Sequence, residues 1–528
     1  MQRSWGIGTV ALTAALVVAG VAFRVASDNG TVAALSPAAG DEALAPASGE
    51  RPPNVLLVVW DTVRADRLSL YGNPAPTTPF LEELAERSRV YDAAVSPSFW
   101  TLPAHASIFT GLPVSSHGTN ADYQWLDDRF VTMAEWYAEH GYATYAWSSN
   151  PNINKGANTI QGFQTFHQAF GQNRWRRMVE EDTRRLIHPK DATSRPNPER
   201  FRNLTHHKSG RVIEEAFTGW LDERDAEQPF FAFLNYMEAH TYRLPSEESR
   251  RAIMDTDERY QKGLTTSNLH QRQTNVMFGR WKPYKPKQRR ALLDVYDASI
   301  RDLDKLLRSV FEQLEQRDLL DDTVVIVTSD HGEQFGEHGL YLHNFSVYQP
   351  LVAVPLLIHY PSRVSPGRVT MPVNTSSIFH TSLELTGLPA PDPAVQAINS
   401  DSLLSAEPRP VVAELTEPCA NPERRRLDAE VRDWTATYQA FYDDDGTKYI
   451  EGSNGVHELY DLTTDPREAT NLVDTEPVER LAVRLAAWRE AIPRLERSEE
   501  DAAASMKQRD NAVDPELLKQ LEDLGYVQ

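Results

Sequence analysis

The stretch NVLLVVWD at residues 54–61 decides the fold class, and the stretch VVIVTSDH at residues 324–331 has the same pattern. Each is a short apolar run without a charged residue until an aspartate follows it. Such runs are typical of strands that are covered on both faces of a sheet. Residues 230–236 (FFAFLNY) and 354–359 (VPLLIH) are similar and predict two further strands.

Helical stretches separate these strands. The clearest lies at residues 291–314, where apolar side chains recur on one helical face. Strands that alternate with helices predict an α/β domain with a mainly parallel central sheet flanked by helices. From about residue 405 the pattern changes to short strands at 437–442 and 448–452 and a helix at 478–495, which predicts a smaller C-terminal α+β subdomain.

The N-terminus carries an uncharged run at residues 4–23 that is just long enough to cross a bilayer as a helix. We expect an exported protein that is anchored at the membrane by this run, or secreted if the run is cleaved as a signal peptide. The expected organisation is a signal anchor or signal peptide at 1–27, an Ala/Pro-rich linker at 28–52, a catalytic domain at 53–404, the C-terminal subdomain at 405–495 and a charged tail at 496–528.

Composition excludes several classes of protein. The 528 residues are 41% hydrophobic, which is enough for a sizeable core and excludes wholesale disorder. The single cysteine, Cys419, excludes an intramolecular disulfide and a thiolate zinc cluster. With 54 Lys and Arg against 75 Asp and Glu, the net charge is −21, which argues against a nucleic-acid partner.

Two inserts interrupt the alternation, at residues 170–212 and 245–290. The second holds 11 Lys and Arg residues, an unusual density in so acidic a chain. It could provide a local positive field that guides an anionic substrate, or it could be a solvated surface excursion.

The candidate metal site consists of Asp61 and Asp330, which each follow a predicted strand, and His331. Ligands bind beyond the carboxyl ends of parallel strands, so both carboxylates should point to the same edge of the sheet. Gly332 should permit the turn at which Asp330 and His331 converge. Two carboxylates and an imidazole suit a divalent metal such as Ca, Mg, Mn or Zn. Taken alone, an aspartate at a strand end more often caps a helix or makes a turn.

The candidate nucleophile is Thr101, in the sequence TLPAH at residues 101–105. Pro103 is tolerated in the first turn of a helix, so Thr101 should lie near a helix N-terminus, where the helix dipole favours an anion. A metal nearby could activate its hydroxyl group for attack. In isolation this motif marks only the start of a helix.

From about residue 53 to 472, the chain resembles the sulfatase family of the alkaline-phosphatase superfamily. The resemblance rests on five blocks in the order that the family shows: PNVLLVVWDTVRADRLSLYG (53–72), TLPAHASIFTGLPVSSHG (101–118), FLNYMEAH (233–240), TVVIVTSDHGEQFGEHG (323–339) and ELYDLTTDPREATNL (458–472).

The chain departs from the family pattern at the expected nucleophile. Sulfatases carry Cys or Ser in C/S-x-P-x-R, which becomes formylglycine, whereas this chain has Thr101 and, in place of the arginine, His105. Around Asn150 the chain lacks the family's Gly-Lys-x-His core. The lysine expected soon after residues 337–339 is also absent, and His343 stands nearby. Thr62 takes the place of the second aspartate in the family's Asp-Asp pair.

A threonine nucleophile resembles instead the phosphodiesterases, phosphonate hydrolases and phosphotransferases of the superfamily. That resemblance implies a metal held by four residues: Asp61, Thr101, Asp330 and His331. It makes Thr101 the nucleophile and places His240 and His343 at the substrate, where they would bind a second metal or protonate the leaving group. His105 and Asn150 would contact the substrate; each histidine could also be an ordinary buried residue.

We therefore expect an exported, metal-dependent hydrolase with one or two divalent ions that acts on a phosphoester, phosphodiester or phosphonate. The alternatives are a sulfuric ester hydrolase and a phosphotransferase acting on an envelope lipid or glycan. A non-enzymatic binding protein is least favoured, because the complete ligand set is retained.

Overall fold

The computed structural model describes residues 51–168, 174–186, 208–254, 256–267, 270–277, 279–343, 345–392, 402–416 and 435–495. The predicted anchor, almost all of the predicted linker and the predicted tail lie outside these residues, so the predictions for them stay predictions. Within the described ranges, no helix combines the length and apolar character that a membrane span requires.

The central sheet has eight strands in the order β11-β2-β10-β7-β1-β6-β4-β5. It is mixed but mainly parallel: β10 alone runs antiparallel to its two neighbours. The strands are β1 (Asn54–Trp60), β2 (Arg89–Tyr91), β4 (Ala143–Ser148), β5 (Thr165–His167), β6 (Phe230–Tyr236), β7 (Thr323–Thr328), β10 (Leu356–His359) and β11 (Gly367–Val369). The expected α/β sheet is confirmed, with the four predicted strands at its centre.

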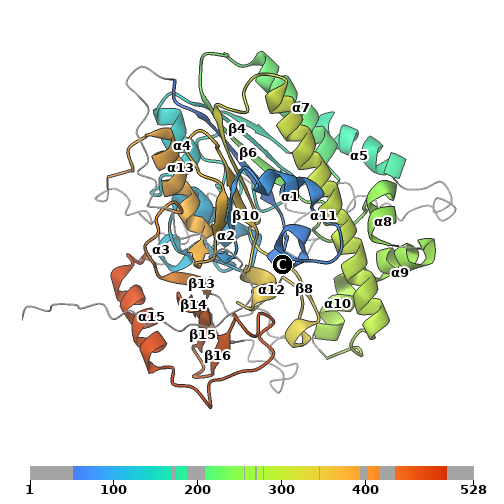
Figure 1. Ribbon diagram of the computed structural model, residues 1–528, viewed down its shortest axis with the longest axis vertical. Helices are drawn as coiled ribbons and strands as arrows, with labels where there is room; N and C mark the ends of the chain where they lie inside the picture. The colour runs from blue at the N-terminus through green and yellow to red at the C-terminus, as the bar shows by residue number, and fades with distance from the viewer. Residues whose placement is uncertain are drawn as a thin grey trace, which may run out of the picture. The chain divides into compact units, whose positions relative to one another are not determined.

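Both faces of the sheet are covered, as the uninterrupted apolar runs predict. Along β1, Leu56, Val58 and Trp60 join one core cluster, which includes side chains of α1, α7 and α11. The alternate residues join a second cluster with side chains of α2, α4 and α13. Figure 1 shows these helices on opposite sides of the strands. Their bounds are α1 (Pro79–Ala85), α2 (Thr101–Thr110), α4 (Met133–Glu139), α7 (Gly210–Glu223), α11 (Pro286–Glu315) and α13 (Ile378–Thr386).

Other elements surround this sheet and its covering helices. They comprise two small two-stranded sheets, β3 (Ala94–Val95) with β12 (Val373–Asn374) and β8 (Gln334–Phe335) with β9 (Tyr341–Leu342). The other helices are α3 (Val114–His117), α5 (Arg174–Leu186), α8 (Glu247–Ile253), α9 (Asp257–Ser267), α10 (His270–Met277) and α12 (Gln349–Val352).

The basic insert at residues 245–290 folds largely into helices α8, α9 and α10 rather than into an irregular loop. It packs on α11, where Tyr260 of α9 contacts Val295 in a small apolar cluster. Part of its charge is neutralised in place, because Arg259 and Arg290 both pair with the buried Asp294.

A four-stranded antiparallel sheet forms the C-terminal part, in the order β13-β14-β15-β16. One face packs against α15, through Leu481 and Leu485, and the other face joins the main core. The elements are β13 (Val411–Leu415), β14 (Tyr438–Tyr442), β15 (Thr447–Gly452), β16 (His457–Asp461) and α15 (Glu479–Ala491). The predicted small C-terminal sheet is confirmed.

A buried ion pair fastens this sheet to the loop that follows β9. Lys448 Nζ lies 2.5 Å from Glu468 Oε1 and donates to the carbonyl of Val347 at 2.6 Å. The other oxygen of Glu468 accepts the backbone N–H of Gln349 at 2.7 Å. Because both charged side chains are fully buried, each depends on the other for compensation.

We expect Lys448→Met to lower the free energy of unfolding by about 3–5 kcal/mol, since it leaves the Glu468 carboxylate buried without its cation. Urea unfolding measures this loss. The matched control is Lys305→Met, which removes the exposed pair with Glu248 and should cost no more than about 1 kcal/mol. Equal stability of the two variants would contradict the role given to the buried pair.

Candidate active site

The predicted site residues converge at one edge of the central sheet, beyond the carboxyl ends of four neighbouring parallel strands. Asp61 follows β1, Asn150 follows β4, His240 follows β6 and Asp330 follows β7. The strands β7, β1, β6 and β4 are consecutive in the sheet, which is why residues far apart in the chain meet there. Thr101 is the first residue of α2, directed at the same edge.

Asp61, Asp330 and His331 form a buried cluster in which one ligand atom from each lies within 4.8 Å of the others. Oδ1 of Asp61 and Oδ2 of Asp330 are buried and have no hydrogen-bond partner among the described residues. Nδ1 of His331 lies 2.9 Å from the Gly332 carbonyl, to which it must donate, so Nε2 keeps its lone pair. Unpaired anionic oxygens beside a basic nitrogen fit a divalent cation.

The electrostatics of the cluster also favour a cation. Burial raises the pKa of Asp61 well above its usual value, and repulsion from Asp330 adds to the rise. Burial likewise raises the pKa of Asp330, to about 7. It lowers the pKa of His331 to about 3, which keeps this imidazole neutral and able to act as a ligand. A bound cation would compensate the two carboxylates that the fold leaves uncompensated.

Thr101 lies directly beside this cluster. Its Oγ1 is 3.3 Å from Nε2 of His331 and accepts a hydrogen bond from Nδ2 of Asn150 at 3.1 Å. The same amide nitrogen donates to Oδ2 of Asp61 at 2.6 Å. Asn150 therefore connects the hydroxyl group to the carboxylate and fixes where Oγ1 points.

Three histidine rings form a row at the site. The His343 ring lies between His331, at a centroid distance of 4.8 Å, and His240, at 5.0 Å. Nδ1 of His240 donates to the carbonyl of Thr241 at 2.6 Å. His343 thus lies next to the Asp/Asp/His cluster, and His240 lies next to His343.

Two residues that the sequence did not single out, Glu333 and Arg243, hold His343. Oε1 of Glu333 is 2.9 Å from Nδ1 of His343, and Oε2 accepts from Nη2 of Arg243 at 2.5 Å. All three side chains are buried. Glu333 stands two residues after His331, but nothing in the sequence pairs it with an arginine 90 positions earlier.

These contacts set the charge of His343. Burial alone would raise the pKa of Glu333, yet His343 and Arg243 lower it to about 2. Burial alone would lower the pKa of His343, yet the Glu333 carboxylate outweighs this effect and raises it. These contacts therefore favour the protonated form of His343, whose ring lies beside that of His331.

The backbone at the site is strained at Thr62. This β-branched residue has a φ of 62°, in the left-handed region that such residues rarely adopt. In this conformation its N–H donates to Oδ1 of Asp330 at 3.2 Å, which joins the ends of β1 and β7.

The role expected of Gly332 is corrected: it leaves room for close packing, since a Cβ there would lie 2.1 Å from the Pro350 carbonyl oxygen.

His105 lies beside the Asp/Asp/His cluster, with Nδ1 3.6 Å from Oδ2 of Asp330, and its contact with the substrate stays a prediction. It sits one turn along α2, where Nδ1 donates to the carbonyl of Thr101 at 2.9 Å. Its ring is fully buried and packs on Phe109 and Phe233, which belong to the core. Burial lowers its pKa to about 3. This geometry favours a role in supporting the start of α2.

We expect Glu333→Gln to lower kcat by about 10–100-fold, because the neutral amide no longer raises the pKa of His343 and holds its ring less firmly. Bound metal should stay at the wild-type level, since Glu333 is outside the Asp/Asp/His cluster. Steady-state kinetics and metal analysis measure the two effects. The control is Glu83→Gln on the surface, where Glu83 pairs with Arg308 and both are half exposed; a Glu333→Gln variant as active as this control would refute the role.

The fold and the site together are those of a hydrolase with a candidate site for a divalent metal at the edge of an α/β sheet. Residues 53–388 match the family described as Sulfatase. The chain belongs to the sulfatase family, which confirms the resemblance seen in its motifs. Members of this family typically bind a divalent metal, in agreement with the buried cluster.

Curated relatives include arylsulfatase K of Homo sapiens, which is 26% identical over 470 residues and covers 81% of each chain. An ulvan-active sulfatase of Formosa agariphila is 22% identical over 443 residues, covering 82% of this chain and 80% of that protein. Among solved structures, the phosphonate monoester hydrolase of Agrobacterium radiobacter superimposes with a TM-score of 0.62 at 19% identity, over 88% of this chain and 97% of that chain.

These relatives bear on the choice of ester. The curated sequences named above are sulfatases, so they support the sulfuric ester hydrolase alternative better than the phosphoryl preference drawn from the sequence. The likeness to the phosphonate monoester hydrolase is a likeness of fold.

Proposed function

We propose that this sulfatase-family hydrolase cleaves an anionic ester with Thr101 as its nucleophile. The proposal rests on the position of Oγ1, which lies 3.3 Å from Nε2 of His331 and 3.1 Å from Nδ2 of Asn150, beside the Asp/Asp/His cluster. A hydroxyl group needs activation to attack, and this is where the fold gathers the groups that can provide it.

Asp61, Asp330, His331 and Thr101 are the residues that would hold a divalent ion. Such an ion would supply positive charge that lowers the pKa of the Thr101 hydroxyl and offsets the negative charge of the ester. Asn150 orients Oγ1 through its hydrogen bond, and the N-terminal end of α2 adds partial positive charge where the anionic ester would lie.

The reaction we propose has two steps. In the first, the Thr101 hydroxyl gives up its proton to solvent, Oγ1 forms a bond to the sulfur or phosphorus atom, the bond to the leaving-group oxygen breaks, and His343 donates a proton to that oxygen. In the second, water attacks the same atom and gives one proton to His343, and the bond to Oγ1 breaks. Oγ1 takes a proton from solvent, which restores the Thr101 hydroxyl, and sulfate, phosphate, a phosphate monoester or a phosphonate leaves. Glu333 and Arg243 hold His343 throughout.

For the ester itself, we place the sulfuric ester first, because the sulfatase relatives match about four fifths of the chain. A phosphoryl or phosphonate ester is the second candidate. It is favoured by Thr101, which stands where the resemblance would place formylglycine and cannot form that aldehyde. The sulfate-binding arginine and lysine also give way to His105 and to the segment around Asn150.

The basic insert supports an anionic substrate of either kind. A cavity of about 670 Å3 is lined by five cationic side chains, Lys262, Arg272, Lys282, Lys285 and Lys287, and by no carboxylate among its lining residues. In a chain with a net charge of −21, such a local surplus would raise the concentration of anions nearby.

A panel of aryl esters separates the two candidates. We expect the enzyme, supplied with each divalent metal in turn, to cleave aryl sulfate with a higher kcat/KM than aryl phosphate, aryl phosphonate or a diaryl phosphate. A higher value for any phosphorus ester would reverse the order of the candidates and favour phosphoryl transfer. No turnover of any ester, by protein that contains metal, would contradict the proposal.

A further inference from the structure

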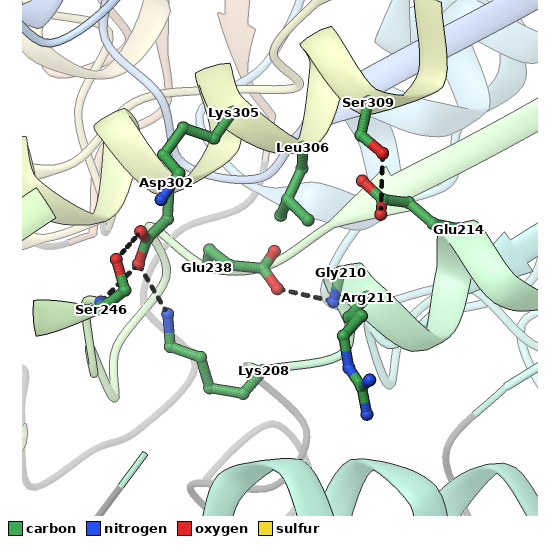
Figure 2. A pocket seen from close by; sticks show the side chains of 10 residues that line it. All are labelled: Lys208, Gly210, Arg211, Glu214, Glu238, Ser246, Asp302, Lys305, Leu306 and Ser309. Atoms are coloured by element: carbon green, nitrogen blue, oxygen red, sulfur yellow. Dashed lines mark hydrogen bonds and ion pairs between the residues drawn. The ribbon is translucent and has the colours of Figure 1, made fainter. Parts of the chain in front are cut away.

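A second cavity, of about 520 Å3, lies between the start of α7, the segment after β6 and helix α11. Figure 2 shows Glu238 in the middle of this cavity, with Asp302 on one side and Glu214 on the other. None of these residues belongs to the catalytic cluster. Sulfatase-family membership and the proposed hydrolysis assign them no role.

Glu238 is a buried carboxyl group with an unpaired oxygen, and burial raises its pKa. Its side chain is 3% exposed, and Oε1 accepts the backbone N–H of Gly210 at 2.8 Å. Oε2 is buried and has no hydrogen-bond partner among the residues that the structure describes. A buried carboxylate oxygen without a donor is costly, so its presence in a cavity indicates a ligand that donates to it.

Glu214 faces the same cavity in a similar state. Oε2 accepts from the Ser309 hydroxyl at 3.2 Å, whereas Oε1 is buried and lacks a partner within the described part of the chain. Burial raises the pKa of Glu214 to about 8, and the nearby Glu238 carboxylate adds to the rise. The two carboxylates are thus close enough to repel each other.

The lysine side chains of the cavity are engaged elsewhere. Lys208 pairs with Asp302 at 3.6 Å, and Lys305 pairs with Glu248. Asp302 is further held by the hydroxyl groups of Ser246, at 2.5 Å, and Ser249, at 2.6 Å. Among the described residues, the unpaired carboxyl oxygens of the cavity are those of Glu214 and Glu238, and burial raises the pKa of both groups more than the charges of Arg211 and Lys208 lower it. A cationic ligand would favour their ionised forms.

A single metal ion does not fit this arrangement. Over the described residues, Glu214, Glu238 and Asp302 are not among the groups whose ligand atoms come within 4.8 Å of one another. The cavity is also far larger than an ion requires. An ammonium group on an organic molecule fits better, because it carries three N–H donors for carboxyl oxygens that lack a donor.

We propose that this cavity binds a small molecule with a primary ammonium group, which donates to Oε2 of Glu238 and Oε1 of Glu214. Ser246 and Ser309, which line the same cavity, offer hydroxyl groups for further polar contacts. An amino sugar and a polyamine both carry the required group. The site is separate from the proposed reaction, so its test does not depend on turnover.

Isothermal titration of the full-length protein with D-glucosamine and with putrescine tests the proposal, and N-acetyl-D-glucosamine serves as the probe that lacks the ammonium group. We expect one or both amines to bind at least about tenfold more tightly than N-acetyl-D-glucosamine. Tighter binding of glucosamine would identify an amino sugar site, and tighter binding of putrescine a polyamine site.

Glu238→Gln and Glu214→Gln should each weaken the better amine by about tenfold or more, because each replaces an anionic acceptor by an isosteric amide. The matched control, Glu215→Gln, changes the exposed neighbour on the same helix and should leave binding unchanged. Thermal unfolding shows whether each variant is folded. If Glu238→Gln does not fold, Glu214→Gln alone tests the proposal. The proposal is overturned if neither amine binds at about 10 mM, or if the folded variants bind as tightly as the control.

Discussion

Thr101→Ala should lower turnover by about a thousandfold or more while the protein keeps its fold. The methyl group cannot attack the ester, and the first step of the proposed reaction then has no nucleophile. Folding should survive because the substitution removes only the interactions of Oγ1 with His331 and Asn150, while apolar side chains pack the rest of α2. The measurements are kcat on the best ester of the panel and the temperature of thermal unfolding.

Thr101→Ser is the matched control, since it retains the attacking oxygen and removes only a methyl group. It should keep a measurable part of the activity, and it should bind as much metal as the parent. An alanine variant that turns over as fast as the serine variant would refute the role of Thr101 as nucleophile and leave the fold and the family unaffected.

Asp330→Asn should lower the affinity for the metal and kcat together, each by about a hundredfold or more relative to the parent protein. The amide keeps an oxygen that can accept the N–H groups of Thr62 and His331, as Oδ1 of Asp330 does at 3.2 and 2.8 Å. It removes the negative charge of the carboxylate, which is the property that holds a divalent cation. Metal analysis after dialysis and steady-state kinetics measure the two losses.

The stability of the metal-free variant distinguishes lost binding from damaged folding. Burial raises the pKa of Asp330 to about 7, so its charged form is unfavourable in the folded protein without a cation. Removing that charge should therefore leave the thermal unfolding temperature of the metal-free protein unchanged or higher. Asp322→Asn, an exposed position just before the same strand, is the control for metal content. Metal retained at the parent's level by Asp330→Asn would contradict the assignment.

The Asp/Asp/His metal site could be predicted from the sequence, because its position follows from a general property of parallel sheets. An aspartate directly after a buried apolar run lies at the carboxyl end of a strand, and two such aspartates on adjacent parallel strands must lie at the same edge. Asp61 and Asp330 meet this condition, and the pairing of β1 with β7 brings them together. The position of Thr101 follows from a second local rule, the tolerance of proline in the first turn of a helix.

The support of the site could not be predicted in the same way, because it depends on contacts between residues far apart in the chain. Arg243 and Glu333 meet only after β6 and β7 are placed on either side of β1. The left-handed conformation of Thr62 is unfavourable for a threonine and is imposed by the junction of two strand ends, so residue type offered no signal for it. Asn150 illustrates a third case: the sequence indicated the position, and the structure supplied its hydrogen bonds to Thr101 and Asp61.

The central claim, that Thr101 attacks the ester, is tested most directly by mass spectrometry of enzyme quenched with acid during turnover at saturating substrate. Trypsin would release Thr101 in the peptide of residues 90–129, which has Arg89 before it and ends at Arg129. We predict that this peptide gains one sulfo or phospho group, that fragmentation places the group on Thr101, and that Thr101→Ala protein treated in the same way lacks it. A group found on another residue, or a burst of leaving group from the parent enzyme with this peptide unmodified, would contradict the claim.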